Sequence, residues 1–244
     1  TAELDYALYY ETLPRAEARQ RAARYLGFAE PSEQSLAVPP QVERWERSFQ
    51  PATRPARPLD VVVVLEESFG SQFVGVLGHA EPGLTPSFDR WTREGLLLEN
   101  LVATGNRTVR GLEGVLCSFV PLPGDSVVRR ARSENVATLA RVFGQEGYQT
   151  AFFYGGYAIF DGMKSFFSDN GWNEIVDQPD FPDAAFRTIW GVADEHIFDA
   201  LLARQQQAAE RGERLFATLL SVSNHKPYEV PAGRAAHIDA LQGR

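Results

Sequence analysis

The stretch DVVVVLEES, residues 60–68, gives the most direct indication of the fold. Its four valines and one leucine follow one another without a polar interruption, which is typical of a strand buried on both faces of a parallel sheet. Two glutamates and a serine come directly after this run. We therefore expect a buried strand after Asp60 whose carboxyl end presents Glu66 and Glu67.

Helical and strand-like patterns alternate along the rest of the chain. Helices are expected over 85–95, 108–119, 134–147 and 194–212, and strands over 96–104, 148–155 and 214–223. This alternation predicts an α/β fold with a mostly parallel central sheet flanked by helices. In such sheets ligands bind at the carboxyl ends of the strands, so polar residues at those ends are the candidates for function.

The sequence before Asp60 differs in composition and pattern from the sequence after it. Residues 14–27 predict an amphipathic helix with proline at its start and glycine at its end. Residues 37–58 are rich in proline and arginine without a clean period, which indicates an irregular connector. We therefore divide the chain into an N-terminal helix and connector, 1–58, and a larger domain, 59–244. The chain starts without methionine and stops abruptly after Arg244, so we expect a fragment truncated at its C-terminal end.

Composition excludes several classes of protein. The 24 Lys and Arg and the 32 Asp and Glu give a net charge of −8, which disfavours a general nucleic-acid role. The longest aliphatic run, 61–65, is far shorter than the ~20 residues of a membrane helix, and no signal-peptide pattern is visible. Cys117 is the single cysteine, so no internal disulfide can form, and its apolar surroundings predict a small core residue.

The first polar strand end carries Glu66 and Glu67. Adjacent strand residues point to opposite sides, so only one of the two carboxylates can enter a given site. Either both are solvated loop residues, or one is a ligand for a divalent cation.

The stretch GNRTVRGLEG, 105–114, sets Thr108 between Arg107 and Arg110 at the start of a predicted helix. A threonine there can cap the helix, which is worth ~1 kcal/mol. A hydroxyl at a helix N-terminus also lies where a phosphate is favoured, and the two arginines would add charge-assisted hydrogen bonds to phosphate oxygens. The two interpretations are compatible.

The third strand end, 221–231, contains His225. A lone loop histidine is more often structural or solvent-exposed, but together with the other two strand ends His225 becomes a candidate. Other charged groups have simpler interpretations. Asp194, Glu195 and His196 are expected in the first turn of a helix as capping residues, and Arg129, Arg130 and Arg132 as solvated surface charges.

Residues 60–78, 84–124 and 219–231 together resemble the lipoteichoic-acid-synthase-like phosphoglycerol transferases of the alkaline phosphatase/sulfatase superfamily. The resemblance implies that Glu67 and Thr108 hold a divalent metal ion, most often Mn, with Mg or Zn as alternatives. It also implies that Thr108 is the nucleophile and that His225 contacts the substrate phosphate or glycerol. Arg107 and Arg110 are expected to balance charge on the phosphoryl oxygens.

The reaction implied by the resemblance moves a phosphoglycerol-type group from a lipid-linked donor to a glycan or lipid acceptor through a phosphothreonine. The implied location is the periplasmic face of the bacterial inner membrane, with membrane helices outside this chain and no nucleic-acid partner. Sulfate-ester hydrolysis is not expected, because 116–121 lacks the sulfatase nucleophile motif.

The sequence departs from the family in two places, and these keep alternatives open. The Asp-His pair that completes the family's metal site is absent, which leaves a non-catalytic binding module as one alternative. The family's Trp and Arg are missing from 153–167, so a phosphoethanolamine transferase or a phosphodiesterase of the same superfamily is another.

Overall fold

The computed structural model describes residues 13–28, 58–78, 84–120 and 124–232. The chain forms two compact units, Thr1–Arg57 and Pro58–Arg244. In the first unit, α1 (Arg15–Leu26) confirms the predicted helix: Pro14 precedes it, and Gly27 ends it in the left-handed conformation with φ 68°. The predicted connector lies outside the described residues up to position 57.

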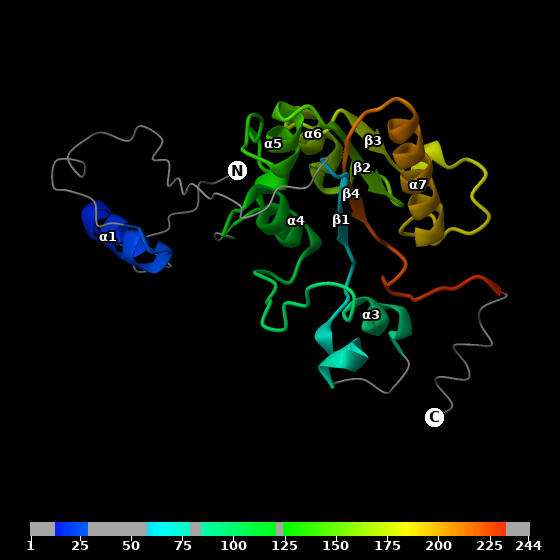
Figure 1. Cartoon of the computed structure of the whole chain (residues 1–244), viewed down its shortest axis with the longest axis horizontal. Helices are drawn as coiled ribbons and strands as arrows, with labels where there is room; N and C mark the ends of the chain where they lie inside the picture. The colour runs from blue at the N-terminus through cyan, green and yellow to red at the C-terminus, as the bar shows by residue number, and fades with distance from the viewer. Residues whose placement is uncertain (1–12, 29–57, 79–83, 121–123, 233–244) are drawn as a thin grey trace. The chain divides into compact units, whose positions relative to one another are not determined.

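The second unit is built on a sheet of four strands in the order β1-β4-β2-β3 (Figure 1). Its strands are β1 (Val61–Leu65), β2 (Gln149–Tyr154), β3 (Glu174–Val176) and β4 (Leu215–Leu220). Every pairing is parallel, with Val61 opposite Phe216 and Gln149 opposite Leu215. The predicted α/β fold with a parallel central sheet is therefore confirmed.

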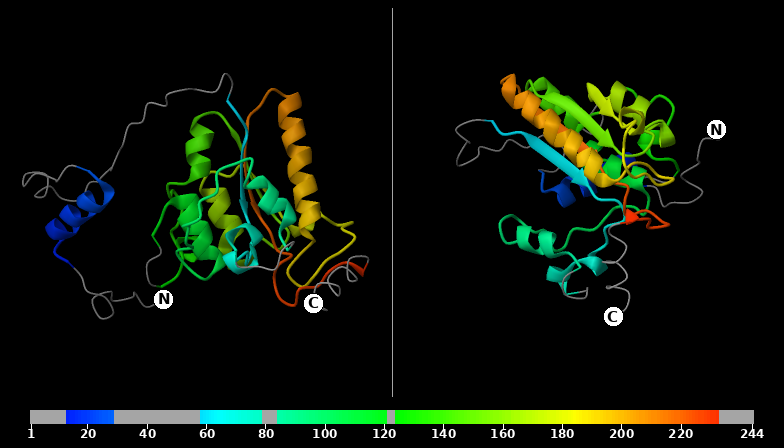
Figure 2. Two further views of the ribbon diagram at one scale, coloured as in Figure 1. Left: turned by 60° about the horizontal axis from the view of Figure 1, so that its bottom comes forward. Right: turned by 90° about the vertical axis from the view of Figure 1, so that its right-hand side faces the viewer.

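Helices cover both faces of this sheet (Figure 2). The covering helices are α4 (Thr108–Cys117), α5 (Leu139–Gln145), α6 (Met163–Asp169) and α7 (Asp194–Glu210), and α3 (Pro86–Trp91) lies beyond the end of the sheet (Figure 1). Short 3-10 turns lie at Ser71–Phe73, Gly75–Leu77, Val127–Arg129, Phe160–Gly162 and Gln178–Asp180. None of these described helices is both long enough and apolar enough to cross a membrane.

Alternate residues of β2 and β4 feed two separate cores. On one face Phe152 and Phe216 pack with residues of α4, α5 and α6, together with Trp172. On the other face Leu219 and its neighbours pack against the apolar side of α7. Cys117 belongs to the first core, as predicted, and burial raises the pKa of its thiol to about 12, so the group stays protonated and inert.

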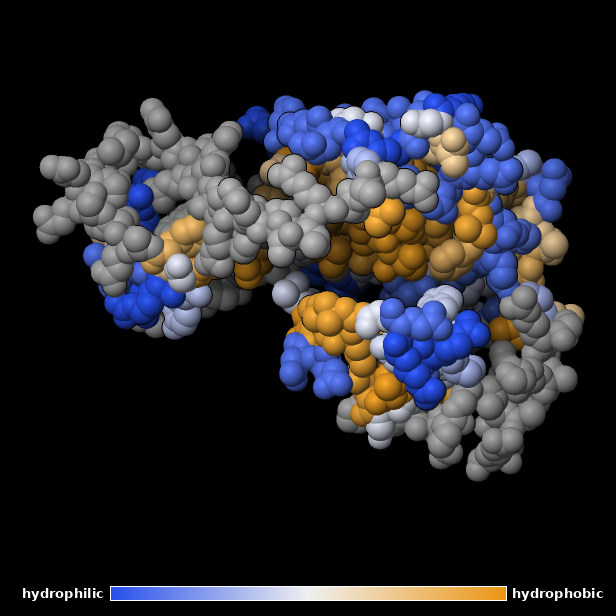
Figure 3. All heavy atoms as spheres, in the orientation of Figure 1, coloured by the Kyte–Doolittle hydropathy of each residue, from blue (hydrophilic) through white to orange (hydrophobic). Residues whose placement is uncertain are grey.

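The predicted burial of β1 on both faces is wrong. Val61, Val63 and Leu65 pack against the core, but Val62 and Val64 are 37% and 40% exposed. The reason is position: β1 is an edge strand of the described sheet, and α7 contacts β4 and β2. Figure 3 shows the resulting apolar area over β1.

Two further expectations from the sequence differ from the structure. Residues 96–104 form no strand; Leu96 is 87% exposed, and no described strand pairs with this segment. Helix α5 begins at Leu139 rather than at 134, because Asn135 is left-handed (φ 65°) and the Thr138 hydroxyl caps the Arg141 N–H at 3.2 Å. In addition, no hydrophobic pattern in the sequence predicted α6 or the three-residue strand β3.

Replacing Phe216 by alanine should lower the free energy of unfolding by about 3–5 kcal/mol, because the lost ring leaves a cavity in the core. Phe216 is completely buried and stacks on Phe143, with ring centroids 4.5 Å apart. The matched control is Phe73→Ala, which removes a half-exposed ring and should cost less than ~1 kcal/mol. Urea unfolding followed by circular dichroism measures both, and equal losses would contradict this account of the core.

Candidate active site

The residues that follow β1 are held in place by the segment that follows β4. The backbone N–H of Glu67 donates to Ser221 Oγ at 2.8 Å. The Asn224 side-chain amide donates to the carbonyls of Glu67 and Ser68 at 3.2 and 3.1 Å. Ser68 itself is left-handed, with φ 55°. These contacts fix the chain where it leaves the sheet, and so fix the starting point of the Glu67 side chain.

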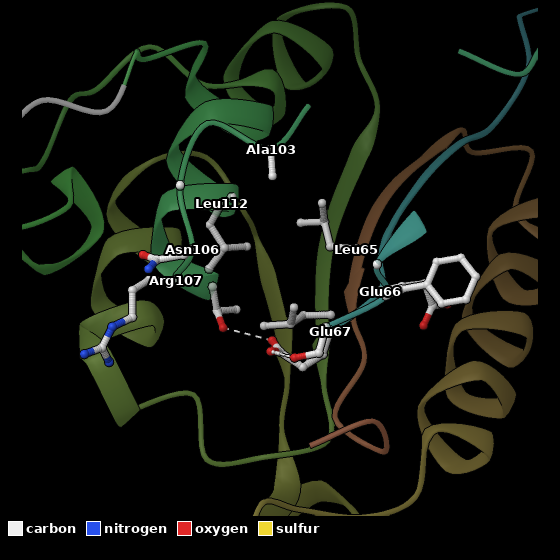
Figure 4. Close-up of a pocket in the computed structure, with 14 residues that line it drawn as sticks. Leu65, Glu66, Glu67, Ala103, Asn106, Arg107 and Leu112 are labelled. Atoms are coloured by element: carbon white, nitrogen blue, oxygen red, sulfur yellow. Dashed lines mark hydrogen bonds between the residues drawn. The ribbon is translucent and has the colours of Figure 1, made fainter. Parts of the chain in front are cut away.

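The Glu67 carboxylate meets the Thr108 hydroxyl at the carboxyl end of the sheet (Figure 4). Thr108 Oγ1 donates to Glu67 Oε2 at 2.9 Å, and Ser68 Oγ donates to the other carboxylate oxygen at 2.8 Å. Thr108 is the first residue of α4, and Arg107 is the residue that precedes the helix. The interpretation of Thr108 as the helix cap is therefore wrong: its hydroxyl is directed at a carboxylate 41 residues away.

Glu66 points away from Glu67, toward the side of the sheet on which α7 lies (Figure 4). Burial raises the pKa of Glu66; a hydrogen bond with Ser221 lowers it and the nearby Asp194 carboxylate raises it, with a net rise. The two neighbouring carboxylates thus lie in different environments, and only Glu67 touches Thr108.

The two oxygen atoms fit a shared divalent cation. Adjacent ligands on an octahedral ion with bonds of about 2.1 Å lie about 3.0 Å apart, close to the 2.9 Å between Thr108 Oγ1 and Glu67 Oε2. Oxygen ligands suit Mg²⁺ and Mn²⁺. Within the described ranges, no group of three or more His, Cys, Asp or Glu residues could hold a metal ion. Glu67 and Thr108 would therefore supply only part of a coordination shell.

Arg107 and Arg110 have different surroundings. Arg107 is exposed, and its guanidinium pairs with no group in the described part of the chain. Arg110 forms an ion pair with the buried Glu113 at 2.6 Å and also donates to the Gly124 carbonyl. Its charge is thus already balanced inside the protein, and its contact with a substrate stays a prediction.

Glu113 ties α4 to the loop that follows it. Besides Arg110, its carboxylate accepts hydrogen bonds from Ser126 Oγ at 2.6 Å and from the Val127 N–H at 2.7 Å. Burial raises the pKa of Glu113, and its hydrogen bonds with Ser126, Arg110 and Val127 lower it. The lowering is the larger effect, so the net change in the pKa is downward. A charged, buried Glu113 therefore fixes the helix that begins with Thr108.

A cavity of about 610 Å³ opens in front of Thr108. Arg107, Arg129, Asp161, Trp190 and His225 line it. On the other side of the Glu67–Thr108 pair lies a second pocket of about 370 Å³. This second pocket is largely apolar, with Leu65, Phe69, Ala103, Leu112 and Leu220 among its lining residues. The carboxylate and the hydroxyl thus lie between a polar cavity and an apolar one.

Arg129 reaches this cavity from the 3-10 turn after α4. Its side chain is 46% exposed and pairs with Asp161 at 3.2 Å and with Asp125 at 3.8 Å. The interpretation of Arg129 as a solvated surface charge is therefore wrong in part. Arg129 lines the same cavity as Arg107 and Arg110.

His225 lies in the cavity with its ring stacked on Trp190. The ring centroids are 3.7 Å apart and the planes differ by 20°. The structure thus brings all of the predicted residues to one region, but it adds Trp190, which the sequence did not single out. The local pattern around Trp190 carries no signal for this, because the contact joins two irregular segments.

Asp194 does not cap its own helix, which corrects the prediction for this residue. Its Oδ1 accepts from the Val222 N–H at 2.7 Å and from the Ser223 N–H at 3.2 Å, and its own N–H donates to Ser223 Oγ at 3.0 Å. Burial raises the pKa of Asp194, the Val222 and Ser223 hydrogen bonds lower it, and the Glu195 charge raises it; the net change is a rise. Asp194 therefore holds the segment that carries His225.

Replacing Asp194 by alanine should leave the Val222 and Ser223 N–H groups without their acceptor and release this segment. Amide exchange at these two positions is expected to speed up by roughly 10–100-fold. Asp199→Ala, on an exposed position of the same helix, is the matched control and should leave both rates unchanged. Hydrogen exchange measured by NMR checks this, and unchanged protection in Asp194→Ala would show that other contacts hold the segment.

The larger unit is similar to known proteins over most of its length. The sequence model of the sulfatase family matches residues 60–237. Over 159 residues the chain is 28% identical to phosphoglycerol transferase I of Xanthomonas axonopodis pv. citri (strain 306). This match covers 60% of the chain and 22% of that protein.

Solved structures agree. A protein of the alkaline phosphatase superfamily from Vibrio parahaemolyticus superposes with a TM-score of 0.71 and 38% identity, covering 75% of this chain and 45% of that one. The lipoteichoic acid synthase LtaP from Listeria monocytogenes (TM-score 0.64, 21% identity) covers 72% and 43%, and the Zn complex of the periplasmic domain of EcEptC from Escherichia coli (0.53, 16%) covers 73% and 48%. The last two show a shared fold. The chain spans less than half the length of each of these relatives.

Proposed function

This chain belongs to the sulfatase family, and from that premise we propose that it carries the nucleophile of a metal-dependent phosphoglycerol-type transferase. The donor is a lipid-linked phosphate, and the acceptor is a glycan or lipid of the cell envelope. The observation that supports this most strongly is the 2.9 Å contact between the Thr108 hydroxyl and the Glu67 carboxylate at the mouth of a cavity lined by arginines.

Thr108 acts as the nucleophile in the first half of the reaction. Its Oγ1 forms a bond to the donor phosphorus while the bond from phosphorus to the lipid alcohol oxygen breaks. The hydroxyl proton passes to solvent, and a proton from solvent neutralises the released lipid alcohol. In the second half an acceptor hydroxyl attacks the phosphorus, Thr108 Oγ1 leaves, and the acceptor proton returns to it.

A threonine hydroxyl is a weak nucleophile without help. A divalent cation held by Glu67 and Thr108, Mn in our proposal, would lower the pKa of the hydroxyl, as it does for bound water. The N-terminus of α4 directs backbone N–H groups toward the same place and favours a bound anion. Arg107 and Arg129 line the cavity, and in this proposal they pair with the phosphoryl oxygens. Positioning the phosphoryl group and stabilising its charge are most of what a protein contributes to phosphoryl transfer.

The apolar pocket on the other side of the Glu67–Thr108 pair supports a lipid donor. Leu65, Phe69 and Leu112 offer an apolar surface within reach of the nucleophile, while Arg110 and Arg129 line the polar cavity and Arg107 lines both. A donor with an apolar tail and a phosphate headgroup would meet both surfaces at once. We propose that this reaction takes place at the periplasmic face of the inner membrane, as the resemblance implies.

Phosphoethanolamine transfer is the second candidate, and one observation favours it. The Asp161 carboxylate lines the polar cavity, where it would suit an ammonium headgroup. Its ion pair with Arg129 at 3.2 Å offsets this preference. We therefore keep phosphoglycerol transfer as the first choice.

The phosphothreonine predicts a covalent adduct. Purified protein incubated with Mn²⁺ and phosphatidylglycerol vesicles should gain the mass of one phosphoglycerol group on the peptide that contains Thr108. Vesicles of phosphatidylethanolamine test the second candidate in the same assay. Thr108→Ala should lose the adduct and at least about a thousandfold in transfer rate, while Thr108→Ser keeps a hydroxyl and should still form an adduct. An adduct on Thr108→Ala would place the nucleophile elsewhere.

Substitutions of the two adjacent glutamates should differ in their effect on the affinity for metal. In calorimetric titrations with Mn²⁺, Glu67→Gln should weaken binding by at least about 10-fold, because a ligand is lost from the shell. Glu66→Gln is the matched control: it removes the same charge one residue away, on the opposite side, and should change binding less than about 3-fold. Equal effects of the two changes would mean that charge alone attracts the ion and that Glu67 is not a ligand.

A further inference from the structure

Trp190 contacts the His225 segment at two points. Its ring stacks on the His225 imidazole at 3.7 Å, and its indole N–H donates to the carbonyl of Lys226. The neighbours of His225 in sequence, Asn224 and Lys226, are exposed. A histidine on such a segment would ordinarily lose side-chain entropy on adopting one orientation, so a fixed partner is needed to hold it.

The turn that carries Trp190 is itself held firmly. The Thr188 N–H donates to the Gly191 carbonyl at 2.8 Å, and the Trp190 N–H donates to Thr188 Oγ1 at 3.1 Å. The Val192 N–H then donates to the Gly155 carbonyl at 3.0 Å, which joins the turn to the end of β2. The indole therefore projects from a braced turn over the cavity.

Three glycines make this close approach possible. A Cβ on Gly191 would lie 2.2 Å from the Gly155 carbonyl oxygen, and a Cβ on Gly155 would lie 2.8 Å from the Val192 carbonyl oxygen. A Cβ on Gly156 would lie 2.6 Å from the carbonyl oxygen of Trp190 itself. All three are contacts with backbone atoms, which cannot rotate aside. The two glycines after β2 therefore allow the turn to lie close enough to the end of β2 for Trp190 to contact His225.

Trp190 and His225 both line cavities that contain Thr108 and Glu67. Phe160 and Tyr154 lie along the smaller of these cavities, and burial, followed by the Glu67 and Asp161 charges, raises the pKa of Tyr154 to about 12. The cavity surface around His225 is thus largely aromatic, with the Asp161 carboxylate beside it.

We propose that Trp190 is a positioning residue: its stacked ring holds the His225 imidazole toward Thr108, so that the imidazole meets the transferred headgroup. This inference rests on the proposed function and deepens it. It assigns recognition of the headgroup to His225, which Trp190 orients from a second loop, in a chain that lacks the family's Trp and Arg at 153–167.

The stack is tested first without any activity. In the wild-type protein the His225 ring protons should be shifted upfield by the indole, and the His225→Gln variant assigns them among the four histidines. Trp190→Ala should abolish the shift and Trp190→Phe should retain part of it. Trp91→Ala, at an exposed position on α3, is the matched control and should change nothing. An unchanged His225 shift in Trp190→Ala would overturn the proposal.

Transfer kinetics then test the positioning role. Trp190→Ala should lower kcat/KM by about 10–100-fold, as expected when a group is misplaced by a small distance, and Trp190→Phe should stay within about 3-fold of wild type. The double variant Trp190→Ala/His225→Ala should be no slower than His225→Ala, since Trp190 acts through the histidine. Additive losses would overturn that role. If the wild-type protein transfers no group from any donor, the proposed function fails, and the NMR comparison alone decides whether Trp190 holds His225.

Discussion

The hydrogen bond between Thr108 and Glu67 is the contact on which the site depends. It joins the residue just beyond an edge strand to the first residue of a helix, 41 positions later in the sequence. The positions of Glu67 and Thr108 depend on contacts outside β1 and α4. Ser221 and Asn224, from the segment after β4, hold the backbone of Glu67, and the buried Glu113 holds α4 through Ser126 and Val127. Two separate networks therefore have to be complete before the carboxylate and the hydroxyl can meet.

The sequence predicts those parts of the site that follow from chain direction alone. Parallel strands bring their carboxyl ends to one edge of the sheet, so polar residues that directly follow strands converge there. Glu67 and His225 could be found in this way. Thr108 could be found because it follows a glycine and stands at the start of a predicted helix. Trp190, Arg129 and the acceptor role of Asp194 could not, because each depends on a contact with a residue far away in the sequence. Such contacts leave no periodic trace in the sequence.

The errors in the fold have a related cause. Hydrophobic runs show which residues avoid water, but they do not show what covers them. The valines of β1 have the pattern of a fully buried strand, yet in the described sheet Val62 and Val64 remain partly exposed at the edge. Residues 96–104 have a strand's composition and no strand beside them. Conversely, β3 has only three residues, too few to show an alternation, and its place in the sheet comes from pairing with β2.

The allocation of charge explains why we propose Arg129, rather than Arg110, as the partner of a substrate phosphate. Both arginines are paired with carboxylates, but in different surroundings. The Arg110–Glu113 pair has side chains only 16% and 3% exposed, and separating such a buried pair costs about 3–5 kcal/mol. The Arg129–Asp161 pair is 46% and 25% exposed, where an ion pair contributes only about 0–1 kcal/mol. A phosphate can therefore take Arg129 from Asp161 at little cost, whereas taking Arg110 would leave a buried charge and loosen the helix that presents Thr108. Proximity to Thr108 in the sequence favours Arg110, but the cost of exchanging partners favours Arg129.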